Sequence, residues 1–160
     1  MKHEMHAHYP APSDVVIKMF TDKDYHGRKM EKMGIEFKVL EHEFDGDNFR
    51  LKAQRSVPIQ ATGLAAKFMP STTQVVNDEK WSVNNKTGSV VVETKGVPLK
   101  MSCTAKMQDE GDSCVVIYSW EIKAKIPMGG GALEKFVVAD MKDREAEERD
   151  AAISLLDAYR

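Results

Sequence analysis

Apolar and polar residues alternate along most of the chain between Ile35 and Ile126, the pattern of strands with one buried face. Turn-forming residues interrupt the alternation at intervals, as in Asp45-Gly46-Asp47-Asn48 and Gly96-Val97-Pro98. The first residues alternate in the same way before Pro10 ends the pattern. The sequence therefore predicts antiparallel strands at residues 2–9, 35–44, 49–57, 72–82, 89–95, 99–108 and 113–126.

Two short helices are expected between the first two strands. Ser13 is a suitable N-cap for a helix that runs to about Phe20, and Asp22 is a suitable N-cap for a second helix that Gly34 ends. The irregular segment at residues 58–71, with one helical turn near Leu64, is a candidate lid or rim of a pocket.

A long helix is predicted for the C-terminal part. After Gly129-Gly130-Gly131, about 29 residues contain neither proline nor glycine. Leu133, Phe136, Val137 and Met141 form an apolar stripe on such a helix. At 1.5 Å per residue the helix is about 43 Å long, more than a typical strand spans, so it is expected to cross the sheet obliquely.

Strand parity indicates which side chains face this helix. Residues Met101 to Met107 and Cys114 to Ile122 present alternate apolar side chains on one face and hydroxyls or charges on the other. With the turn centred on Glu110-Gly111, Cys103 and Cys114 are offset by about 13 Å along the sheet. A disulfide needs Cα atoms within about 7 Å, so two buried, reduced thiols are expected.

Composition narrows the class of protein. The 160 residues suffice for one domain with a single core. The 23 basic and 25 acidic residues give a net charge of −2, too weak a field to hold a nucleic acid or an anionic membrane surface. The N-terminus lacks an apolar signal core, and no segment approaches the roughly 20 apolar residues of a membrane span. A cytoplasmic protein without integral membrane association is expected, and its oligomeric state stays open.

The chain resembles the helix-grip superfamily of START-related lipid-transfer domains, plant pathogenesis-related allergens, polyketide cyclases and aromatases, and in particular its small uncharacterised bacterial members. The resemblance covers essentially the whole chain. It rests on the element order, the segment Pro10-Ala11-Pro12-Ser13-Asp14-Val15-Val16, Trp81 at a strand end and the glycine-rich hinge before the last helix. It implies an α+β helix-grip fold, in which a curved antiparallel sheet of six to seven strands wraps around the C-terminal helix and leaves an apolar cavity.

Such a cavity implies a hydrophobic small-molecule ligand, lipid-like or aromatic, and no cofactor or metal. The residues expected to contact it face inward from the strands or lie on the helix stripe: Phe37, Val39, Arg55, Val57, Met101, Cys103, Tyr118, Trp120, Phe136, Val137 and Met141.

Arg55 is the unusual member of this set, because it is a charge at an inward position after Phe49, Leu51 and Ala53. One interpretation is a cationic anchor for a carboxylate or hydroxyl of the ligand. The other is a structural ion pair, with Glu41 as the candidate partner, or a side chain that reaches solvent past the sheet edge.

Other ionisable residues have simpler interpretations. His3, His6 and His8 lie on one strand, where a solvated strand is favoured over a metal site, and His26 and His42 are expected on the surface. Arg144 and Glu148 are expected to form an intrahelical pair that either overhangs the sheet or forms the polar floor of a pocket.

Two further functions remain open. No nucleophile elbow, phosphate-binding loop or dinucleotide fingerprint occurs, but a cyclase- or dehydratase-like enzyme that uses Tyr118, Tyr25, Arg55 or Glu41 as acid or base needs none of them. An interaction module like the chaperone regulators that share the fold needs a filled interior and an exposed apolar patch instead.

Overall fold

The computed structural model describes residues 1–160. It contains seven strands, three α-helices and two short 3₁₀ helices, η1 and η2. Their bounds are β1 Lys2–Tyr9, α1 Ser13–Phe20, α2 Lys23–Lys32, β2 Glu36–Phe44, β3 Asn48–Pro58, η1 Gly63–Lys67, β4 Thr72–Ser82, β5 Thr87–Thr94, β6 Leu99–Glu110, β7 Ser113–Ala124, α3 Gly130–Leu155 and η2 Leu156–Tyr159. The strands and their order agree with the alternation in the sequence.

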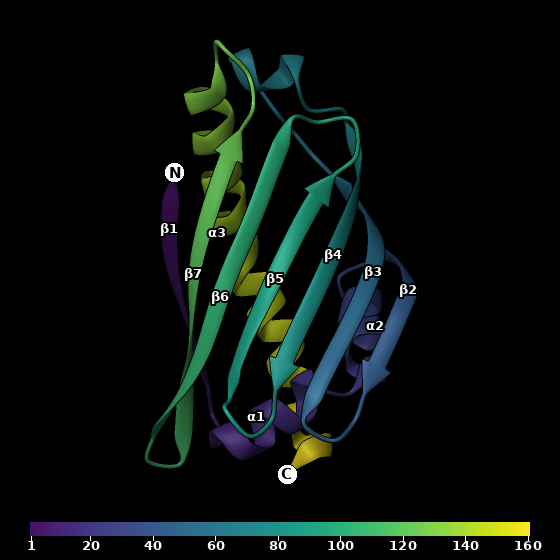
Figure 1. Cartoon of the computed structure of the whole chain (residues 1–160), viewed down its shortest axis with the longest axis vertical. Helices are drawn as coiled ribbons and strands as arrows, with labels where there is room; N and C mark the ends of the chain where they lie inside the picture. The colour runs from purple at the N-terminus through teal and green to yellow at the C-terminus, as the bar shows by residue number, and fades with distance from the viewer.

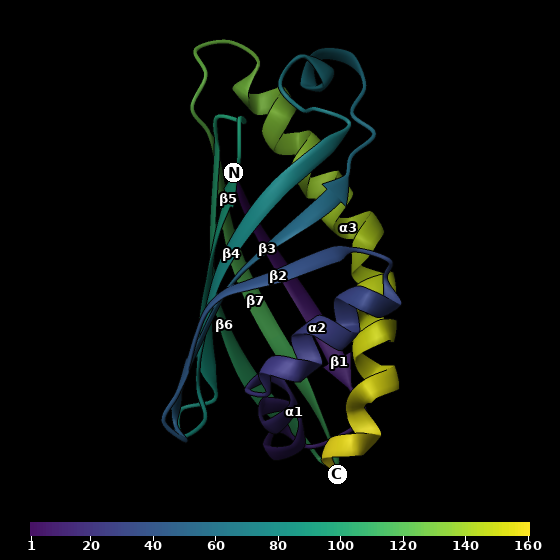
Figure 2. The ribbon, with the colours of Figure 1, turned by 90° about the vertical axis from the view of Figure 1, so that its right-hand side faces the viewer.

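All seven strands form one antiparallel sheet with the order β1-β7-β6-β5-β4-β3-β2. Strands β2 to β7 follow one another as hairpins, and β1 closes the far edge by pairing with β7 (Figure 1). The sheet curves, and α3 runs obliquely along its inner face, as Figure 2 shows. The predicted α+β helix-grip fold is therefore confirmed. None of the helices combines the length and the apolar character that crossing a membrane requires.

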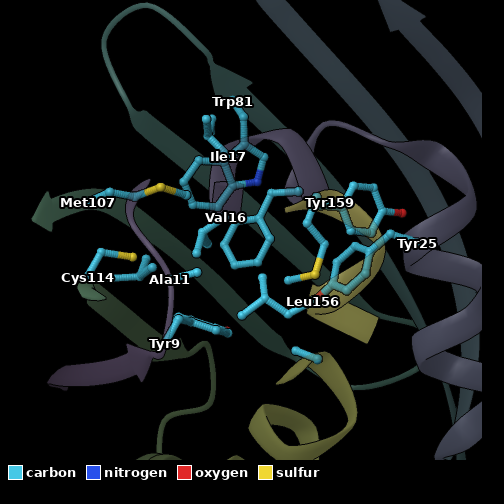
Figure 3. Close-up of a cluster of buried hydrophobic side chains, with 14 of the residues drawn as sticks. Tyr9, Ala11, Val16, Ile17, Tyr25, Trp81, Met107, Cys114, Leu156 and Tyr159 are labelled. Carbon is cyan, nitrogen blue, oxygen red and sulfur yellow. The ribbon is translucent and has the colours of Figure 1, made fainter. Parts of the chain in front are cut away.

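The core is divided into two clusters. One lies around α1 and brings Val16 and Ile17 together with Tyr9 and Trp81 of the sheet (Figure 3). In this cluster Phe20 packs edge-on against Tyr9, and its ring centroid lies 5.1 Å from that of Trp81. The other joins the inner faces of β5, β6 and β7 to Leu133 and Val137 of α3. These two clusters fix α3 against the sheet near both of its ends, and the hollow described below lies between them.

The glycine hinge behaves as predicted, and its geometry explains the choice of residue. Gly129 has φ of +84°, a conformation that L side chains rarely adopt. A Cβ at this position would also lie 2.8 Å from the Leu64 side chain of η1. The hinge therefore packs the segment 58–71 against the start of α3, and Ile59 and Met69 of that segment reach the hollow.

Three local predictions were wrong. Ser13 begins α1 instead of capping it: Pro12 is the N-cap, and the Ser13 amide and hydroxyl both donate to Asp109 at 2.7 and 2.8 Å. The turn between β6 and β7 is centred on Gly111-Asp112, because Glu110 pairs with Ser113, so Cys103 and Cys114 lie even farther apart than expected. Both cysteines are buried and unpaired, as predicted. The helix α3 ends at Leu155 and the chain finishes as a 3₁₀ turn.

Candidate functional site

A hollow of about 270 Å³ separates the inner face of the sheet from α2 and α3. Every strand contributes to its wall, because the alternation of each strand points every second side chain toward α3. The lining is largely apolar, since 26 of the 38 residues around it are hydrophobic. Protein interiors contain few voids larger than a water molecule, so a hollow of this size is a specific feature of the chain.

Nine of the eleven residues expected to contact a ligand line this hollow: Phe37, Arg55, Val57, Met101, Tyr118, Trp120, Phe136, Val137 and Met141. Two do not. Val39 lies opposite Ala53 on the inner face, but at the edge of the sheet, where it is 39% exposed. Cys103 is buried in the second core cluster beside the hollow, where it pairs with Trp120.

The predicted contact between Glu41 and Arg55 is wrong because of a β-bulge. The register of β2 against β3 shifts between Val39 and Glu41, which turns Glu41 to the outer face. There Glu41 accepts from Arg50 at 3.3 Å. Arg55 stays on the inner face opposite Phe37, so the bulge removes the carboxylate that the sequence offered it.

One ion pair ties α2 to α3 across the wall of the hollow. The Lys29 ammonium lies 2.9 Å from the Glu148 carboxylate, and the Lys29 side chain is only 13% exposed. The Lys29 charge holds the Glu148 pKa at about 2, although burial acts in the opposite direction. Burial alone would lower the Lys29 pKa, but Glu148 and Glu79 raise it above its usual value. Both groups are therefore charged at neutral pH.

The predicted pair between Arg144 and Glu148 is consequently absent. Arg144 instead pairs with Asp140 one turn earlier, at 3.0 Å, and its guanidinium also donates to the carbonyl of Pro58. Arg149 pairs with Glu145 at 2.8 Å. All of these side chains line the hollow, so this part of α3 covers the sheet and supplies the polar side of the pocket.

His26 was predicted on the surface and is instead 6% exposed in the wall of the hollow. Its Nε2 lies 2.8 Å from the Phe20 carbonyl, which can only accept, so Nε2 carries the proton. Burial lowers the His26 pKa more than nearby Glu79, at 3.5 Å, raises it. His26 is therefore neutral at neutral pH, and Glu79 also accepts from the Trp81 indole at 2.9 Å.

Three tyrosines also face this region. Burial raises the pKa of Tyr9, Tyr25 and Tyr118 well above 10, so all three phenols are protonated at physiological pH. Tyr118 lines the hollow from β7, and Tyr25 lines it from α2. They can donate a hydrogen bond to a bound molecule, but they are poor proton acceptors.

The three histidines of β1 lie on two faces of the sheet, as the alternation predicts. His6 and His8 point outward and lie 3.5 Å from Glu4 and 3.6 Å from Glu110, respectively. His3 points inward, where burial lowers its pKa and its Nε2 has no hydrogen-bond partner. The two outward histidines thus have different acidic neighbours.

Two other polar atoms beside the hollow have no partner. They are Nε of Arg55 on β3 and Oδ1 of Asn77 on β4, and both are buried. Native proteins pair nearly all buried polar atoms, so two such atoms in one wall call for an explanation.

Comparison with known proteins assigns the chain to a family. Residues 4–153 match a family model described as "Protein of unknown function (DUF2505)". The chain belongs to the DUF2505 family. A search of curated proteins found no match to it.

Solved structures similar to this DUF2505 protein share its fold. The protein TTHA0849 from Thermus thermophilus superposes with a TM-score of 0.68 at 17% identity, over 99% of this chain and 98% of that one. A START superfamily protein from Mycobacterium smegmatis gives 0.60 at 10% identity, over 96% and 98%. The di-domain ARO/CYC protein BexL, from the BE-7585A biosynthetic pathway, gives 0.62 at 12% identity, over 96% of this chain and 45% of BexL. The resemblance to the START-related superfamily is confirmed for the fold.

Several polar residues that line the hollow were missed from the sequence, among them Asn77, Glu79, His26 and Lys29. Asn77 and Glu79 share the parity of buried Trp81 on β4, so the alternation contained the signal that places them inward. For His26 and Lys29 the signal was weaker, because most residues of α2 are polar, but both lie four residues from an apolar residue that faces the hollow, Met30 and Tyr25 respectively.

Proposed function

We propose that the protein binds a hydrophobic small molecule in the hollow between its sheet and α3. The observation that carries the proposal is the hollow itself, which is largely apolar and is bounded by nine of the residues expected from the sequence. A protein selected only for stability gains by filling such a space, because each unfilled methylene costs about 1 kcal/mol. An interaction module does not need the hollow.

The size of the hollow favours a compact ligand. Its volume of about 270 Å³ lies just below the usual range of ligand pockets, about 300–1,000 Å³. A ligand that buries about 300 Å² of apolar surface gains roughly 7 kcal/mol. Association costs at least about 4 kcal/mol, so apolar burial alone gives weak binding and a polar contact adds usefully to affinity.

Within this proposal, the apolar wall residues contact the body of the ligand, and Arg55 or Tyr118 orients one polar group. The apolar contacts come from β2, β3, β6, β7 and α3: Phe37, Val57, Met101, Trp120, Phe136, Val137 and Met141. Val39 and Cys103 stay outside this set because neither reaches the hollow.

A cyclase- or dehydratase-like reaction is the second candidate, favoured by one observation. Neutral His26, which lines the hollow and has its proton on Nε2, can accept a proton at Nδ1, and Tyr118, which also lines the hollow, can donate one. Arg55→Ala and Tyr118→Phe are expected to abolish turnover of a cyclisable polyketide-like substrate without unfolding the protein. Unchanged turnover in both variants would remove these residues as acid or base.

Native mass spectrometry of gently purified protein tests the binding function. We expect a retained lipid-like or aromatic mass, and weaker retention in Phe136→Ala because Phe136 lines the hollow. Phe44→Ala is the matched control, since Phe44 is 44% exposed on β2 and lies outside the hollow. Absence of any bound mass, together with no binding of added apolar compounds, would contradict the proposal.

A further inference from the structure

The charges around the hollow are nearly all paired. Eight charged side chains line it, four cations and four carboxylates: Lys29, Arg55, Arg144, Arg149, Glu79, Asp140, Glu145 and Glu148. Three cations have a carboxylate within 3.0 Å. The fourth carboxylate, Glu79, accepts a hydrogen bond from the Trp81 indole and lies 3.5 Å from His26. The half-buried Arg55 side chain alone has no carboxylate within 4.0 Å, and its buried Nε has no hydrogen-bond partner in the protein.

Neither the sheet nor α3 satisfies Arg55. Its neighbours across the sheet are Phe37 on β2 and Val75 on β4, which are both apolar. Glu148 is near enough for the Arg55 charge to lower its pKa, but that carboxylate is already held by Lys29 at 2.9 Å. A buried guanidinium nitrogen without an acceptor destabilises the protein, so its retention here indicates an acceptor that the chain does not supply.

Asn77 extends the same site by one strand. Asn77 pairs with Ala53 and Arg55 pairs with Val75, so the two polar side chains are diagonal neighbours on the inner face, with Cβ atoms within about 8 Å. Arg55 Nε offers a donor, and Asn77 Oδ1 offers an acceptor. One small group with both an acceptor and a donor can satisfy the two atoms together.

We propose that the ligand is an anionic amphiphile, whose carboxylate accepts from Arg55 and whose hydroxyl, on a carbon near the carboxylate, donates to Asn77. This inference rests on the proposed binding function and names the ligand class of that site. The carboxylate is favoured over a neutral acceptor because Arg55 is the one cation of the hollow that lacks a counter-charge. The apolar body then lies along the methionine- and aromatic-rich wall of the hollow.

Titration calorimetry of the full chain with three matched probes tests the ligand class. Decanoate carries the charge, methyl decanoate has a similar chain without it, and β-hydroxydecanoate adds the hydroxyl. Decanoate is expected to bind roughly 10- to 100-fold more tightly than its ester, the range of a charge-assisted hydrogen bond. β-Hydroxydecanoate is expected to bind a further roughly 3- to 10-fold more tightly, the range of a neutral hydrogen bond.

Variants assign these preferences to residues. Arg55→Met should bind decanoate and its ester equally. Arg50→Met is the matched control, because Arg50 lies on the same strand but the outer face, where it pairs with Asp78 at 3.0 Å. It removes the same charge and should keep the preference for decanoate. Asn77→Leu should lose only the preference for the hydroxyl.

The possible failures are distinguishable. If the ester binds wild type as tightly as decanoate, the anionic class is wrong while the proposed binding function stands. Equal loss of the preference in Arg50→Met would also overturn the assignment, because it would indicate general attraction by net charge. If none of the three probes binds, and no other apolar compound does, both proposals fail. Should Arg55→Met not fold, the comparison of acid with ester on wild type decides by itself.

Discussion

The ion pair between Lys29 and Glu148 is the clearest place to test the structure energetically. It joins residues 119 positions apart and holds α2 against α3 on one side of the hollow. Glu148→Gln keeps the size of the side chain but removes its charge, leaving the 13% exposed Lys29 ammonium without a carboxylate. We therefore expect this variant to fold and to be less stable than wild type.

The magnitude follows from the pKa of Glu148, which is about 2 instead of 4.5. At 1.36 kcal/mol per pKa unit, this difference corresponds to about 3.4 kcal/mol as an upper limit. Because 43% of the Glu148 side chain is exposed, solvent screens the interaction, and about 1–2 kcal/mol is the realistic loss. Urea unfolding at neutral pH measures it directly.

The contribution of Glu148 to the free energy of unfolding should decrease as the pH falls. A carboxylate whose pKa is lowered by folding stabilises the protein fully above its unfolded pKa of about 4.5 and loses that contribution as the pH falls toward about 2. The stability difference between wild type and Glu148→Gln should therefore shrink across that window. Glu147→Gln is the control, because Glu147 is exposed on the same helix and forms no ion pair. Equal stability of Glu148→Gln and wild type at neutral pH would mean that the ion pair does not stabilise the fold.

Two other predictions concern packing and thiol chemistry. Gly88→Ala should lower the free energy of unfolding by about 1–3 kcal/mol, because a Cβ there would lie 2.5 Å from the Trp81 ring. Gly131→Ala, whose added Cβ would meet open space in α3, should be neutral or stabilising, and thermal melts of both variants and wild type measure the difference. A Gly88→Ala variant as stable as wild type would contradict the close contact with Trp81. Burial raises the pKa of Cys103 to about 12 and of Cys114 to about 11, so iodoacetamide at neutral pH should label them only in urea. Rapid labelling of native protein would contradict this.

Much of the fold could be predicted because strand alternation is a local signal. Met101, Cys103, Tyr118 and Trp120 lie on the inner face even though the turn between their strands was misplaced, since a register error of two residues preserves parity. The glycine hinge was equally readable, because a left-handed residue at Gly129 leaves few alternatives.

The remaining errors arose where distant or irregular structure decides the outcome. The bulge after Val39 reverses the parity of β2. The residue types carry a trace of it, because the apolar positions change from odd numbers up to Val39 to even numbers at Leu40 and Phe44, but a uniform alternation was assumed for the whole strand. The partner of Glu148 comes from a helix near the other end of the sequence, so helical spacing suggested Arg144 instead. Ser13 has the residue type of a cap, but its hydroxyl is used by Asp109, which no local pattern reveals.

Entry of a ligand into the space between the sheet and α3 can be observed by NMR of the methionine methyl groups. Six of the ten methionines line the hollow: Met5, Met30, Met33, Met69, Met101 and Met141. On titration with decanoate, methyl decanoate and naphthol, we expect these methyl signals to shift and to show intermolecular Overhauser effects. Signals of buried Met19 and of Met128, which is 84% exposed, should stay unchanged. Perturbation confined to Met128, or none with any of the three compounds, would mean that no ligand enters the hollow.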